Sequence, residues 1–91
     1  MDRKLSRFFK AIEGNKVIRA THISLFGALW VKWYLHDRKN PMLVTRQELM
    51  QWSKIRSRKT YYKCMNDLVK FGHIKHKTSF NPLAKSEVKL L

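Results

Sequence analysis

One short run in the second half of the chain carries the side chains best suited to hydrogen-bonding chemistry. They are three cations, a phenol and an amide, spaced to share one side of a helix: Arg58, Lys59, Tyr62, Lys63 and Asn66. An arginine can bridge O6 and N7 of guanine with two hydrogen bonds, and an asparagine can do the same for adenine. A tyrosine can stack on a base or bond a phosphate. These residue types predict recognition of nucleic-acid bases rather than catalysis of a covalent reaction.

The stretch from Leu49 through Asn66, which includes this run, contains no acidic residue. Between Leu49 and Asn66, Lys54 and Arg56 add to the three cations named above. An exposed helix normally mixes both signs of charge to gain ion pairs along its surface. Ser57 is a suitable N-cap, and the free amides and positive dipole end of a helix that starts there attract phosphate. The alternative is that the run is one patch of a uniformly basic protein.

Patterns for catalysis or metal binding are not found. The sequence has no paired carboxylates in a cleft pattern, no nucleophile beside a base and, with three glycines in all, no glycine-rich phosphate loop. Cys64 is a lone cysteine, which provides neither a disulfide nor a metal framework. His73 and His76 should point to opposite faces of a strand, and His22 and His36 have no obvious partner. We therefore expect no enzymatic activity, no metal and no cofactor.

The charge balance indicates a polyanionic partner. The 91 residues include 20 Lys and Arg against 6 Asp and Glu, a net charge of +14. This excess repels itself in the folded state, and a polyanion would relieve the repulsion. Nucleic acid is the first candidate, an acidic membrane surface the second and an acidic protein the third. The length suits one domain, and the aromatic content of 12% argues against disorder.

Two amphipathic helices are predicted in the first half of the chain, over 3–13 and 21–37. Gly14-Asn15 should end the first helix with a pair suited to positive φ, Thr21 should cap the second, and Pro41 should follow its end. Their apolar sides exceed what one small sheet can cover, so part of them should face each other or a partner chain, with a homodimer as one such arrangement. The candidate residues for this face are Leu5, Phe8, Phe9, Ile12, Trp30 and Trp33.

A helix-turn-helix pair is predicted over 45–52 and 57–71. Thr45 and Glu48 have the spacing of a capping box, in which the hydroxyl bonds the amide of residue 48 and the carboxylate reaches back. The residues expected to be buried on the two helices are Leu49, Trp52, Tyr61, Met65 and Leu68.

A β-hairpin is predicted over 73–91, directly after Gly72, which stands where a glycine ends a helix. The alternation of apolar and polar residues gives two strands, with a loop over 79–85 between them. Phe80 in this loop should pack back on the domain. The polar and basic side chains of the hairpin that could reach a phosphate backbone are Lys75, Lys77, Asn81 and Lys85.

This order of elements predicts an α+β fold of the winged helix-turn-helix type over 1–91, with an extra N-terminal helix and a small antiparallel hairpin as the wing. In such a fold the second helix of the pair enters the major groove of double-stranded DNA, and the hairpin loop follows the backbone or the minor groove. The residues predicted to contact DNA are Thr45, Arg46, Arg56, Ser57, Arg58, Lys59, Tyr62, Lys63, Asn66, Lys75, Lys77, Asn81 and Lys85.

The sequence also resembles a known group of proteins. Residues 53–68 (SKIRSRKTYYKCMNDL) and 71–74 (FGHI) resemble the helix-turn-helix of bacterial winged-helix regulators and replication-initiator domains. The whole chain is similar to a compact group of such proteins from mobile genetic elements, through 22–26 (HISLF) and 79–82 (SFNP) as well. The resemblance implies DNA binding, as a transcription regulator or an excision or replication accessory factor. The group carries a glycine in its loop where residues 83–86 read LAKS, which implies a differently shaped wing tip.

Other functions and locations follow from the same observations. A winged helix can also serve as a protein–protein interaction module, in which case the aromatic residues of the first two helices would be the working face. The basic surface would bind RNA as well as DNA, although the aromatic sheet of common single-strand readers is missing. No secretory or membrane-spanning segment is recognised, so we expect a cytoplasmic protein that associates with the nucleoid when bound to DNA.

Overall fold

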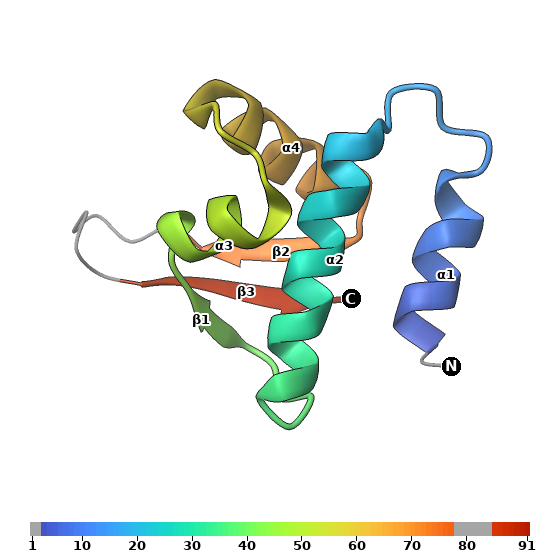
Figure 1. Ribbon diagram of the computed structural model, residues 1–91. Helices are drawn as coiled ribbons and strands as arrows, with labels where there is room; N and C mark the ends of the chain where they lie inside the picture. The colour runs from blue at the N-terminus through green and yellow to red at the C-terminus, as the bar shows by residue number, and fades with distance from the viewer. Residues whose placement is uncertain (1–2, 78–84) are drawn as a thin grey trace.

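The computed structural model describes residues 3–77 and 85–91. This part of the chain forms four helices and a three-stranded antiparallel sheet, which confirms the α+β class (Figure 1). In chain order the elements are α1 (Arg3–Ile12), α2 (Ala20–Leu35), β1 (Met42–Val44), α3 (Arg46–Ser53), α4 (Arg58–Lys70), β2 (Ile74–Lys77) and β3 (Ser86–Leu90). Helix α1 lies on the other side of α2 from α3 (Figure 1), and its Phe8 ring contacts His73, just before β2, with ring centroids 4.9 Å apart.

Helix α2 is the centre of the core, and its ends differ from the prediction. It begins at Ala20 rather than after a cap at Thr21, because the Arg19 amide donates to His22 Nδ1 over 3.0 Å and starts the helix earlier. It ends at Leu35 rather than at residue 37, since Asp37 and Arg38 have positive φ values of 59° and 58°. The helix therefore stops before Pro41 can act on it. Leu25 and Leu29 are among its fully buried side chains.

Helix α3 confirms half of the predicted capping box. Thr45 Oγ1 accepts from the Glu48 amide over 3.1 Å, but the Glu48 carboxylate accepts from Lys32 of α2 instead of reaching back. Trp52 was predicted to be buried and is 43% exposed. The prediction is wrong because α3 turns Leu49 and Ser53 inward, which leaves Trp52 on an outer side.

Helix α4 matches its predicted caps. Ser57 Oγ accepts from the Thr60 amide over 3.2 Å at the start. At the end, Gly72 has φ of 79°, and the amides of Gly72 and His73 donate to the Val69 and Leu68 carbonyls over 3.0 and 2.9 Å. This is the Schellman arrangement that a glycine after a helix makes possible. The predicted inward side is confirmed, since Tyr61, Cys64, Met65 and Leu68 are buried.

The sheet has the strand order β1-β3-β2, with β3 in the centre. The hairpin register pairs Ile74 with Leu90 and His76 with Val88. These side chains and those of β1 form the inner face against the helices, where Met42, Val44, Ile74, Val88 and Leu90 are buried. The predicted hairpin is confirmed in its strands. Phe80 and Asn81, to which predictions were also attached, lie outside the described residues.

Helix α1 is fixed to the domain by the Phe8 ring and by Lys4, whose Nζ donates to the Leu90 carbonyl of β3 over 3.2 Å. Phe8 is 2% exposed and stacks on Phe26 with ring centroids 3.9 Å apart. Phe8 and Trp33 were predicted for a partner face and are buried in the chain's own core, so neither can form such a surface. Of the other candidates for this face, Phe9 is 47% exposed, whereas Leu5, Ile12 and Trp30 are partly buried against the core. Neither Gly14 nor Asn15 has a positive φ, so the prediction that this pair ends α1 through a positive φ is wrong.

Candidate nucleic-acid interface

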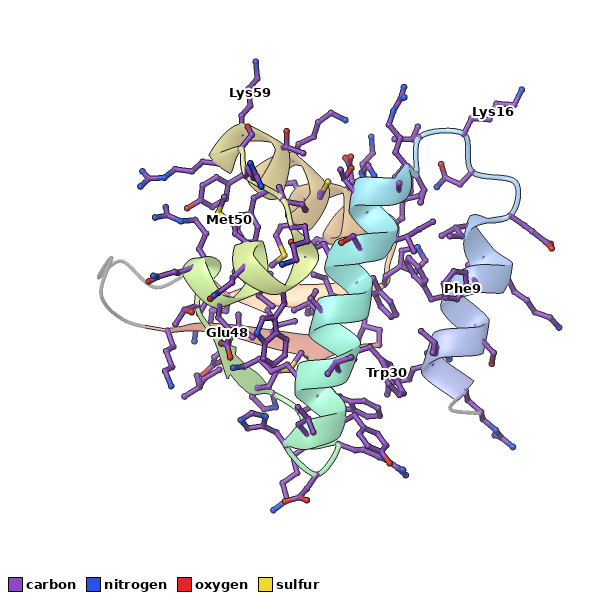
Figure 2. All side chains as sticks on the ribbon, viewed as in Figure 1. Phe9, Lys16, Trp30, Glu48, Met50 and Lys59 are labelled. Atoms are coloured by element: carbon purple, nitrogen blue, oxygen red, sulfur yellow. The ribbon has the colours of Figure 1, made fainter. Side chains whose placement is uncertain are left out.

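The outward side of α4 is open to solvent. The side chains predicted to meet DNA there are all exposed: Arg58, Lys59, Tyr62, Lys63 and Asn66. Lys59 extends away from the body of the protein at the start of the helix (Figure 2). Because Ser57 caps the helix through its side chain, the first turn is well formed where these cations begin. The arrangement therefore presents cations, a phenol and an amide on a helix whose other side is fixed in the core.

Asp67 fixes α4 against the start of α2. The Asp67 Oδ2 atom accepts from His22 Nε2 over 2.8 Å, and His22 is 2% exposed. Since His22 Nδ1 accepts from the Arg19 amide, the ring proton lies on Nε2 and points at the carboxylate. This hydrogen bond, followed by the Lys63 ammonium 3.4 Å away, holds the pKa of Asp67 below its usual value. The acid of α4 is thus turned toward the core and partly neutralises Lys63.

Helix α3 is tied to α2 at both of its ends. The Lys32 ammonium, on a side chain that is nearly fully buried, donates to Glu48 near the start of α3 over 2.5 Å. The Ser24 hydroxyl donates to the Ser53 carbonyl at the end of α3. A buried ammonium needs such a partner, because an unpaired charge in the interior is costly. The two contacts fix the orientation of α3, and so of the turn that leads into α4.

A contact on the outer surface joins α3 to α4. Arg46 Nη1 donates to the Tyr62 hydroxyl oxygen over 3.2 Å, so two of the predicted DNA contacts lie together. The neighbouring Tyr61 is buried, and burial, with Tyr62 nearby, raises its pKa to about 12 against the opposing effect of Arg46. Tyr61 is therefore neutral and structural, whereas Tyr62 is exposed and available.

Two of the predicted contact residues have a structural role. The hydroxyls of Thr45 and Ser57 both accept a backbone amide as N-caps of α3 and α4. Each hydroxyl still has a proton to donate, so capping and a contact with a phosphate are compatible. Arg56, in the turn between the helices, is exposed.

The cations of the hairpin occupy a different surface from those of α4. Lys75 and Lys77 alternate with the inward Ile74 and His76, so they lie on the outer face of the sheet. Lys85 is exposed just before β3, and Asn81 lies outside the described residues. Burial lowers the pKa of His76, which keeps that ring neutral near pH 7. The structure thus separates the predicted site residues into two groups.

Sequence reasoning missed the polar contacts that position α4. His22 was expected to have no partner, and it bonds Asp67, 45 positions away. The spacing of Lys63 and Asp67, four residues apart on one helix, was a readable signal for their contact. Nothing in the sequence pattern places Lys32 beside Glu48, because that contact depends on how α2 and α3 cross.

Known proteins give no guide to this chain: no family model matches it, and no curated protein or solved structure is significantly similar to it. Within residues 3–77 and 85–91, histidine, cysteine and acidic side chains form no group of three that could hold a metal ion. No helix in those ranges has the length and apolar character needed to cross a bilayer.

Proposed function

We propose that this protein is a winged helix-turn-helix module that binds double-stranded DNA with α4 in the major groove. The element order supports the fold: a helix and a strand, two helices joined by a short turn, then two strands. The antiparallel sheet, in which β3 lies between β1 and β2, suits a hairpin that projects as a wing.

The outward side of α4 is the observation that carries the proposal. Its five predicted contact residues are exposed, three of them are cations, and Asp67 is turned aside by His22. A helix fits the major groove and presents its first residues to base edges. Because α4 is capped at both ends and hydrogen-bonded to α2, the backbone positions from which these side chains extend are fixed.

The roles of the residues follow from their chemistry. Arg58 and Asn66 suit direct contacts with bases, since each can form two hydrogen bonds to a purine. Arg56, Lys59 and Lys63 suit phosphates on either side of the groove. Lys85, just before β3, and Arg46 of α3 suit the adjoining backbone. Binding of this kind, without chemistry, fits a regulator or an excision or replication accessory factor.

Selection of bound duplexes from a random pool tests the proposal. We expect a preferred sequence, and Asn66→Ala should relax the preference at one base pair at a cost of about 1–3 kcal/mol. Lys59→Ala should instead weaken all sequences alike, because a phosphate contact carries no sequence information. An absence of duplex binding even at low salt would contradict the proposal, as would tighter binding to single-stranded RNA than to any selected duplex.

A further inference from the structure

The outer face of the sheet places like charges directly opposite one another. The register pairs Lys75 of β2 with Lys89 of β3, and both side chains are exposed. The next pair toward the loop is Lys77 with Glu87. A hollow of about 230 Å³ lies at this face, lined by Pro41, Lys75, His76, Lys77, Glu87 and Lys89. Three of its six lining residues are lysines, and one is acidic.

The fold keeps this repulsion in place. Like charges directly opposite on neighbouring strands destabilise a sheet. The strands cannot slip to separate Lys75 from Lys89, because a shift of one residue would turn the buried Val88 and Leu90 out of the core. None of the three lysines forms an ion pair within the residues that the structure describes. Glu87 is the one acidic residue in this lining and forms no ion pair within the described residues, so an external anion would relieve the repulsion.

We propose that the outer sheet face, centred on Lys75 and Lys89, binds the phosphate backbone of a second DNA segment. The proposal depends on the proposed function, and charge complementarity determines the occupant. Helix α4 and the sheet bury their inner sides, through Met65 and Val88 for example, against the same core. Their exposed sides thus point away from that core in different directions. The phosphates at Lys75 and Lys89 then belong to a different segment from the one on α4.

A capture experiment with two duplexes tests this second site. Full-length protein is bound to an immobilised duplex, and retention of a second, fluorescent duplex is measured. We expect Lys89→Gln to lower retention of the second duplex about fivefold while capture by the first changes less than about twofold. The matched control, Lys10→Gln, removes the same charge from an exposed position of α1 and should retain the second duplex.

The outcomes separate the two proposals. If wild-type protein is not captured by the first duplex, the proposed function fails. If it is captured but retains no second duplex, or if the sheet variant retains as much as the control, the second site alone is refuted. Binding of anionic phospholipid vesicles through Lys75 and Lys89, without retention of a second duplex, would also overturn it in favour of a membrane.

Thermal unfolding gives an independent test of the repulsion between Lys75 and Lys89. At low salt and without DNA, Lys89→Gln should raise the Tm by about 1–5 °C, because it removes the repulsion with Lys75. Saturating duplex should narrow or reverse this difference, since the wild-type pair then faces phosphate. A Tm that is unchanged or lower without DNA would show that the pair carries no strain and would contradict the argument.

Discussion

Helices α1 and α4 are similar in composition and differ in how they are held. Both are short and basic, and neither has an acid in its first turn. Helix α4 buries four side chains, is capped by Ser57 and is bonded to α2 through Asp67. Helix α1 buries Phe8 alone, with Leu5 and Ile12 partly covered.

The comparison shows that a basic amphipathic pattern does not by itself identify a recognition surface. Reading a base edge requires side chains that are held close to the productive geometry by the elements beneath them. The backbone of α4 is held in this way by its caps, by its buried side and by the hydrogen bond between His22 and Asp67. Helix α1 offers a comparable charge on a weaker support, so it is better suited to general attraction of polyanions than to reading a sequence.

The largest expected effect is on α1. Phe8→Ala removes a buried ring that stacks on Phe26, a change that costs about 3–4 kcal/mol in a core. Because this ring is the main anchor of α1, the loss should appear as local release of that helix. Hydrogen exchange should show fast exchange of α1 amides with α4 amides little changed. Equal acceleration in both helices would contradict the contrast.

The next effect concerns the tie between α2 and α3. Glu48→Leu leaves the buried Lys32 ammonium without its carboxylate and should lower the free energy of unfolding by about 2–3 kcal/mol. The value is at the low end for a buried pair because the Glu48 side chain is 30% exposed. The control Lys32→Met/Glu48→Leu removes both charges and should recover most of the loss in urea unfolding. A single variant as stable as wild type would refute the role of the pair.

Asp67→Asn should loosen α4 and change the pH dependence of stability. The His22 hydrogen bond, and then Lys63, lower the pKa of Asp67 in the folded state, so its ionised form stabilises the fold above pH about 4. This contribution is lost as the pH falls through the folded pKa. At pH 7 the variant should lose about 1–2 kcal/mol, and the difference from wild type should shrink below pH about 4.

Asp37→Asn is the matched control for Asp67→Asn. Asp37 is exposed in the loop after α2, and asparagine tolerates its positive φ of 59°. We expect urea unfolding of this variant to follow wild type at every pH. A difference between Asp67→Asn and wild type that stays constant from pH 7 to pH about 3 would contradict the assigned role of the Asp67 charge.

The smallest effect concerns Arg46 and Tyr62 on the surface. A double-mutant cycle with Arg46→Ala and Tyr62→Phe should give a coupling of about 0.5 kcal/mol in the free protein, as for an exposed polar pair. The same cycle measured in DNA affinity should give a larger coupling, because Arg46 then positions the Tyr62 hydroxyl toward the phosphate backbone of the DNA. Additive effects on affinity would show that the two residues contact DNA independently.

The parts of the fold that depend on neighbours in sequence could be predicted. The Ser57 cap, the inward side of α4 and the glycine end at Gly72 arise from residues within one or two turns of each other. The alternation of Val88 and Leu90 with polar residues likewise fixed their place on the inner face of the sheet. The exposed side of α4 followed from the same periodicity.

The parts that depend on how helices cross could not be predicted. Trp52 looked buried because its spacing from Leu49 suits one helical face, but α3 turns Ser53 inward instead, where its carbonyl accepts from the Ser24 hydroxyl of α2. Phe8 looked like a partner contact, and the place it fills beside Phe26 is formed only when α1 folds back. The hydrogen bond from His22 to Asp67 likewise forms only when α2 and α4 pack together.

Salt-dependent DNA binding of two matched variants distinguishes binding through α4 from binding through the net charge of the protein. Arg58→Gln/Lys59→Gln on α4 and Arg3→Gln/Lys10→Gln on α1 each remove two exposed cations. By fluorescence anisotropy with a selected duplex, we expect the α4 variant to lose affinity about tenfold or more and to reduce the log–log salt slope by about 1, through the phosphate contact of Lys59, with little change for the α1 variant. Equal losses from the two helices would contradict the account, because DNA would then respond to the net charge of the protein and not to α4.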